Sequence, residues 1–180
     1  MAFGSAPSNQ NPAQSTKFQL HFDRLPDMTF FCQAVNIPGI SIQAYPQPTQ
    51  FVELYTPGNK LQYETLEIKF IVDEDYQSWQ SVHDWIRAMS FPHDFEEYVN
   101  LKLQNRNMPP GSTSLPPQYS DAYLSLYTNK NNENFKIKFI DCFPITLSEI
   151  HLDVENNADT IIYGEASFKF SYYKIGRAHV

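Results

Sequence analysis

Residues 51–89, FVELYTPGNKLQYETLEIKFIVDEDYQSWQSVHDWIRAM, contain the patterns that decide the fold. Apolar residues occupy alternate positions in the middle of this stretch: Leu66, Ile68, Phe70 and Val72. Such alternation predicts an antiparallel strand with one buried face. Ahead of it stand Pro57, Gly58 and Asn59, which are residue types that favour a reversal of the chain. We therefore predict a hairpin that turns at these three residues.

After Val72 the apolar spacing changes to that of an amphipathic α-helix. The apolar stripe consists of Tyr76, Trp79, Val82, Ile86 and Met89, with Trp85 beside it. The acidic run 73–75 supplies the acceptors and negative charge that a helix N-terminus favours, and Pro92 predicts an end near Ser90. We expect five side chains to pack this helix onto the sheet: Trp79, Val82, Trp85, Ile86 and Met89.

Further alternating runs predict hairpins over residues 18–35 and 122–139, and a last strand over residues 166–172. The length of 180 residues fits one domain with a sizeable core. Many short strands and one helix predict a mainly β fold, an antiparallel β-barrel or sandwich with one flanking α-helix.

The two ends of the chain differ from its middle. Residues 1–16 are rich in Ser, Asn, Gln and Pro, which predicts a flexible N-terminal segment. Residues 17–174 are expected to form the β domain, with a long proline-rich insertion at residues 91–120. Residues 175–180 match the translation of a common sequencing adapter, so we expect them to be an artefact of sequence assembly.

Composition argues against several classes of protein. The formal net charge is −7, and Lys and Arg form no cluster along the sequence, which disfavours nucleic-acid binding through phosphate neutralisation. Cys32 and Cys142 lack the spacing of a disulfide framework or a zinc site. Without an apolar run of membrane-spanning length or a signal peptide, we expect synthesis in the cytoplasm and no membrane partner.

Candidate catalytic and metal-binding residues have simpler explanations. The pairs His83-Asp84 and His93-Asp94 resemble those of metal phosphohydrolases, but such a site needs further ligands on neighbouring helices. The acidic run 73–75 lacks the glycine and the bidentate glutamate of a calcium loop, and no serine has the context of a nucleophile elbow. We predict no catalytic residue, no metal and no cofactor, and therefore no enzyme.

Residues 51–85 resemble the tail-tube protein family of contractile bacteriophages. The shared order is the segment 56–60 (TPGNK), the pair Tyr63-Glu64, the alternating strand 66–72, Asp73-Glu74, and Asp84-Trp85 on the helix. Residues 142–173 also resemble the last hairpin of that family, and residues 32–40 resemble its second strand with the following Pro-Gly break.

This resemblance implies a hexameric ring in the virion tail, stacked with others around a lumen through which DNA passes without specific binding. Other tail and baseplate proteins are the implied partners, and the sheath is a further candidate. The chain would be either the tube subunit or a junction protein that begins or ends the tube. A type VI secretion-like tube protein and a receptor- or carbohydrate-binding β-module of a virion remain alternatives.

Two sets of residues follow as functional candidates. The hairpin is expected to mediate assembly through Phe51, Glu53, Tyr55, Pro57, Gly58, Asn59 and Lys60. Cationic groups on a tube wall would hold DNA by phosphate contacts. The polar face of this hairpin, with Glu53 and Glu67, is therefore expected to face the lumen.

Overall fold

The computed structural model describes residues 11–90, 95, 96, 98–100, 118–153 and 160–177. Its strands are β1 (Phe18–Phe22), β2 (Cys32–Val35), β3 (Ile40–Pro48), β4 (Glu53–Tyr63), β5 (Leu66–Ile71), β6 (Ser120–Tyr127), β7 (Glu133–Leu147), β8 (Tyr163–Lys169) and β9 (Tyr172–Arg177). Its helices are α1 (Met28–Phe31) and α2 (Gln77–Ser90). All strand pairs are antiparallel, so the predicted mainly β class is confirmed.

The body is a sandwich-like arrangement in which the strands follow the order β1-β6-β7-β8-β5-β2. One layer of the sandwich consists of β1, β6, β7 and β9, and the other consists of β7, β8, β5 and β2. Strand β7 belongs to both layers, because its first part pairs with β6 and β9 and its last part pairs with β8. Asp141, at φ 58°, lies where β7 passes from one set of partners to the other. The path ends at β1 and β2 without pairing them, so the described strands form no closed barrel.

The predicted hairpin over residues 18–35 does not form. Strand β1 pairs with β6, β2 pairs with β5, and α1 stands between them in the chain. Since α1 contacts both β1 and β5, it covers the place where the two ends of the strand path come close. The predicted hairpin over residues 122–139 is confirmed as β6–β7.

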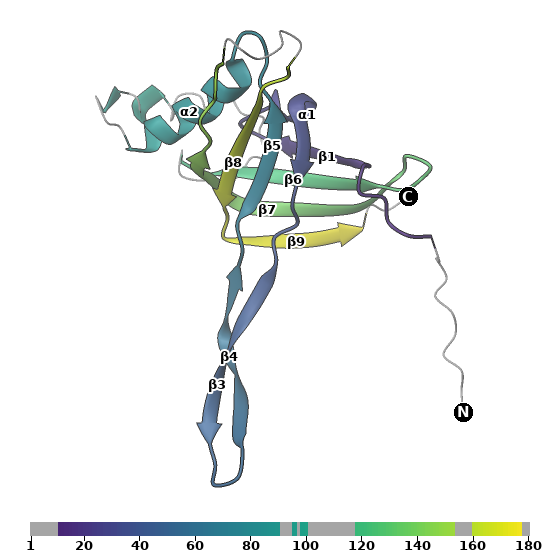
Figure 1. Ribbon diagram of the computed structural model, residues 1–180, viewed down its shortest axis with the longest axis vertical. Coiled ribbons are helices and arrows are strands. Elements are labelled where there is room, and N and C mark those ends of the chain that lie inside the picture. The colour runs from purple at the N-terminus through teal and green to yellow at the C-terminus, as the bar shows by residue number, and fades with distance from the viewer. Residues whose placement is uncertain (1–10, 91–94, 97, 101–117, 154–159, 178–180) are drawn as a thin grey trace.

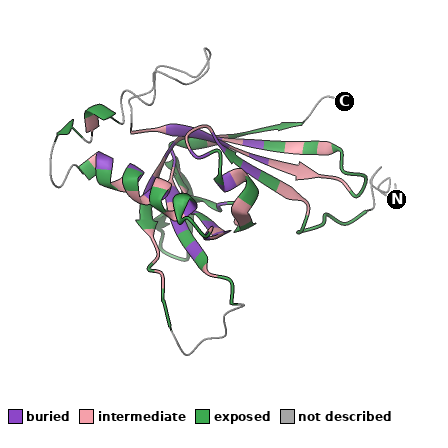
Figure 2. Cartoon of the chain, turned by 90° about the horizontal axis from the view of Figure 1, so that it is seen from above, coloured by how far each residue is buried: buried purple, intermediate pink, exposed green. Residues whose placement is uncertain are grey.

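One apolar core lies between the layers and α2 (Figures 1 and 2). Its largest fully buried side chains include Trp85, Phe22, Phe70, Phe139 and Phe168. Trp85 is 2% exposed and Val82 is completely buried, whereas Trp79, Ile86 and Met89 are partly buried and pack against the core. The sequence predicted that Trp85 lies beside the apolar stripe. In the structure it lies at the centre of the buried face of the helix.

Helix α2 begins on an acidic cap. The Asp73 carboxylate accepts hydrogen bonds from the backbone N–H groups of Gln77 at 3.1 Å and Ser78 at 2.8 Å. Burial acts to raise the pKa of this carboxyl, but the hydrogen bonds from Ser78 and Gln77 outweigh it and hold the pKa below its ordinary value. Ionised Asp73 thus satisfies N–H groups that have no partner within the helix.

Strands β3 and β4 form a separate two-stranded ribbon, here called the arm, which projects from the body (Figure 1). The predicted turn at residues 57–59 is wrong, because these residues lie inside β4 and the chain reverses at residues 49–52. The register shifts opposite them, between Ile42 and Ala44. A Cβ at Gly58 would lie 2.7 Å from the carbonyl oxygen of Gln43, so glycine permits a close approach of the strands here instead of a turn.

The domain boundaries predicted from the sequence stay predictions. Residues 11–16 are exposed and belong to no strand or helix, and residues 1–10 lie outside the described part. Most of the proline-rich insertion at 91–120 also lies outside it. Strand β9 continues to Arg177 on β7, and the assignment of residues 175–180 to an assembly artefact stays a prediction.

Candidate functional site

The arm carries many exposed apolar side chains. Its apolar side chains that are at least half exposed are Ile40, Ile42, Tyr45, Phe51, Val52, Leu54, Tyr55 and Leu61. A monomeric soluble protein seldom leaves large apolar patches in water, and such patches commonly mark interaction sites. A two-stranded hairpin is also marginally stable on its own. Both facts indicate that another surface covers the arm.

The part of the arm nearest the body has one apolar face and one polar face. Ile42 pairs directly with Leu61, and these two side chains therefore share a face. Ser41 pairs with Gln62 and lies on the opposite face. Because Ile42 is 52% exposed and Leu61 is 50% exposed, none of the described residues covers the apolar face.

That apolar face is continuous with the core of the body. Tyr63, at the end of β4, packs its ring 5.4 Å from Phe170 and 5.2 Å from Tyr173, measured between ring centroids. Phe170 in turn contacts Phe139 at 5.1 Å. A protein surface placed on the arm would therefore extend the hydrophobic core across the contact.

All seven hairpin residues proposed from the sequence lie on the arm. They are Phe51, in the turn, and Glu53, Tyr55, Pro57, Gly58, Asn59 and Lys60, in β4. Sequence reasoning missed that this stretch pairs with β3, which begins with Ile40 and Ile42, because it paired the stretch with β5 instead. The alternation of Ile40 and Ile42 with polar residues was the available signal.

The two glutamates proposed for a lumen do not lie together. Glu53 is near the tip of the arm, where it pairs with Pro48, whereas Glu67 is in β5 of the body. Glu67 lines an open polar groove of about 520 Å³ at the root of the arm. Nearby, the Lys69 amino group lies 3.5 Å from the Glu165 carboxylate. The polar outer face of β5 and β8 thus carries charges of both signs.

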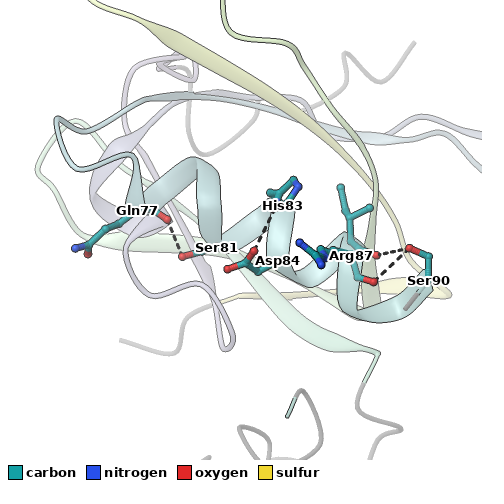
Figure 3. Close-up of polar contacts among 7 residues, drawn as sticks. Gln77, Ser81, His83, Asp84, Arg87 and Ser90 are labelled. Atoms are coloured by element: carbon teal, nitrogen blue, oxygen red, sulfur yellow. Dashed lines mark hydrogen bonds and ion pairs between the residues drawn. The ribbon is translucent and has the colours of Figure 1, made fainter. Parts of the chain in front are cut away.

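The outer side of α2 carries polar contacts that are local to the helix (Figure 3). Ser81 donates to the Gln77 carbonyl at 2.7 Å, and the His83 ring lies 3.2 Å from the adjacent Asp84 carboxylate. His83 also stacks on Trp79 at 5.2 Å. Among the described residues, no group of His, Cys, Asp and Glu could hold a metal ion; His93 and Asp94 lie outside them. His83 and Asp84 are surface residues without further ligands.

None of the helices in the described residues combines the length and the apolar character that crossing a bilayer needs.

Comparison with known proteins supplies a family and a set of structural relatives. The family model described as phage tail tube protein matches residues 5–176. The tail tube terminator protein of Enterobacteria phage T4 is 26% identical over 171 residues, which span 92% of this chain and 89% of that protein.

Two solved structures share the fold. A chain of the tube-terminating cap of the anti-feeding prophage has a TM-score of 0.60 at 14% identity, covering 99% of this chain and 100% of that one. A chain of the sheath-tube complex of an extracellular contractile injection system, in its extended state, has a TM-score of 0.58 at 12% identity. That match covers 97% of this chain and 100% of the other.

Proposed function

Because this chain belongs to the phage tail tube protein family, we propose that it forms a ring that ends the tail tube of a virion. It is a structural protein of the tail tube type and not an enzyme. The observation that carries the finer proposal is the match to the T4 tail tube terminator protein over nearly the whole chain. The repeated tube subunit is the second candidate, supported by the fold shared with the sheath-tube complex.

The exposed arm supports assembly into a ring. A ring needs two different surfaces on each copy, one of which fits the other on the next copy. The uncovered apolar face of the arm, with Ile42 and Leu61, is suited to be one of them. The resemblance to tail-tube proteins implies that such a ring has six copies. Its other partners would be tube, baseplate and sheath proteins of the same tail.

Copy number separates a terminator from a tube subunit. We expect isotope-dilution mass spectrometry of purified virions to find one ring of this chain per packaged genome. Electron microscopy of tubes freed from their sheath, with a gold-labelled antibody, should then show label at a single end. Several rings per genome, with label along the tube, would instead identify the repeated subunit.

The path of DNA gives a further test of the ring. We propose that the outer face of β5, with Glu67, faces the lumen, where Lys69 is neutralised by Glu165. Glu67→Lys would add a phosphate contact in every copy, and should therefore slow DNA ejection more at low salt than at high salt. Glu74→Lys, at the exposed start of α2, is the matched control and should eject normally. Equal ejection rates for both variants would contradict the lumen assignment.

Glu53 has a different place in this proposal. Because it lies near the tip of the arm and far along β4 from the body, we assign it to the assembly surface and not to the lumen.

A further inference from the structure

Four lysines that are scattered in the sequence lie on or beside one solvent face of the sheet formed by β1, β6, β7 and β9. His21, Tyr123, Lys138 and Lys174 are successive cross-strand partners and form one row across this sheet. Residues that pair directly share a face, and Lys136, two positions from Lys138 on β7, shares it too. Lys17 precedes β1 beside the turn at residues 129–131. We call this surface the lysine–tyrosine face.

Three of these lysines lie over aromatic rings. The amino groups of Lys136 and Lys138 lie 5.3 Å and 5.2 Å from the centre of the Tyr123 ring, and that of Lys174 lies 5.6 Å from the Tyr172 ring. Such cation–π contacts keep the cations at defined positions while their outer sides face solvent. The side chain of Lys136 is 47% exposed and that of Lys138 is 37% exposed.

Acidic residues within the face make it a poor surface for a polyanion. Lys138 forms an ion pair with Asp121 at 2.7 Å, and Lys136 lies 3.8 Å from Glu133. Nucleic-acid binding requires a surplus of cations that are free to neutralise phosphates. Tyrosine is instead enriched at contacts between proteins, and charged groups there are matched by complementary charges on the partner.

The charge of the whole chain points to the occupant. The formal net charge is −7, although these four lysines lie together, so the remaining surface is strongly acidic. An acidic copy of the same chain is therefore electrostatically complementary to this face. The strands that carry it, β6, β7 and β9, extend away from α2 and from the arm (Figure 1), so the face is distinct from both.

We propose that the lysine–tyrosine face binds an acidic surface of the neighbouring copy in the ring. This contact rests on the proposed function, because it requires the ring. It adds to the apolar arm a second, electrostatic contact, which orients the copies and makes their association sensitive to salt.

The test reverses two exposed lysines, Lys136→Glu and Lys174→Glu, and leaves the paired Lys138 unchanged. Sedimentation should show ring dissociation constants that are raised by roughly tenfold or more at low salt, since like charges would now meet across the contact. Lys136→Arg with Lys174→Arg keeps the charge and should assemble as the unmodified chain does.

Crosslinking identifies the occupant directly. A carbodiimide applied to rings mixed from light and heavy isotope copies should join Lys136 or Lys174 to a carboxylate of a different copy. Rings of unchanged affinity in the Lys136→Glu/Lys174→Glu variant would overturn the contact while leaving the ring intact. If that variant assembles normally but is missing from tails, the face binds another tail protein, and the proposal is again overturned. An unmodified chain that stays monomeric would contradict the ring itself.

Discussion

Replacing Trp85 with alanine is expected to lower the free energy of unfolding by about 3–5 kcal/mol, the range for a large aromatic side chain removed from a core. Trp85 is 2% exposed and its ring lies 6.1 Å from that of Phe168. The guanidinium of Arg24 lies 5.1 Å from the Trp85 ring, and the indole N–H donates to the Gln118 carbonyl at 3.1 Å. The substitution removes all of these contacts and leaves a cavity. Urea unfolding followed by circular dichroism measures the loss.

Two other aromatic residues show whether burial is the cause. Trp79 is partly buried on the same helix, so Trp79→Ala should cost less than Trp85→Ala. Tyr45 is 54% exposed on the arm, and Tyr45→Ala should change the stability of the monomer by no more than about 0.5 kcal/mol, as is usual for surface substitutions. Equal losses in all three variants would mean that α2 does not pack through Trp85.

The sequence predicted best those elements whose signal is local. The period of two in residues 66–72 corresponds to β5, and the helical spacing that follows corresponds to α2. Asp73 caps the helix as the acidic run suggested. In each of these elements the residues that decide the structure are neighbours in the chain, so their pattern is visible without knowledge of the fold.

Features that depend on distant pairing were missed. Pro57, Gly58 and Asn59 have the composition of a turn, but they lie within β4, where Pro57 pairs with Ala44 of β3 beside a shift of register. The four lysines seemed scattered for the same reason, since only the alignment of β1, β6, β7 and β9 brings them to one surface. The sequence also left open whether the sheet closes into a barrel. Closure depends on whether β1 pairs with β2, and the periodicity of a single strand does not show which strand it pairs with.

Loss of ring assembly is expected when the apolar face of the arm is made charged. In the double variant Ile42→Glu/Leu61→Lys the two new charges face each other across the strands, so the ribbon keeps a favourable cross-strand pair and the net charge is unchanged. A neighbouring copy would then have to bury an ion pair in place of two apolar side chains. Because a few central residues of an interface each contribute about 2 kcal/mol or more, and because burying an ion pair has a desolvation cost, we expect association to weaken by roughly a hundredfold or more.

The same two charges on the other face provide the control. Ser41→Glu/Gln62→Lys changes the directly paired residues next to Ile42 and Leu61, but on the polar side of the ribbon. Analytical ultracentrifugation should find rings for this variant and monomers for the first. At a dilution where the control also dissociates, the two monomers should have similar melting temperatures. Rings of equal stability in the two variants would show that the apolar face of the arm is not buried in the assembly.

The prolines of the arm indicate why a side-chain face, and not a strand edge, should make this contact. Pro46, Pro48 and Pro57 lie in the outer half of the ribbon, where each removes an N–H donor that a neighbouring strand would need. Edge-to-edge addition of a further strand is therefore disfavoured there. If the ring nevertheless formed by strand addition along β3 or β4, Ile42→Glu/Leu61→Lys would leave the backbone donors intact and assembly would survive. Monomers of the apolar-face variant beside rings of its control are the result that distinguishes packing of side chains from pairing of edges.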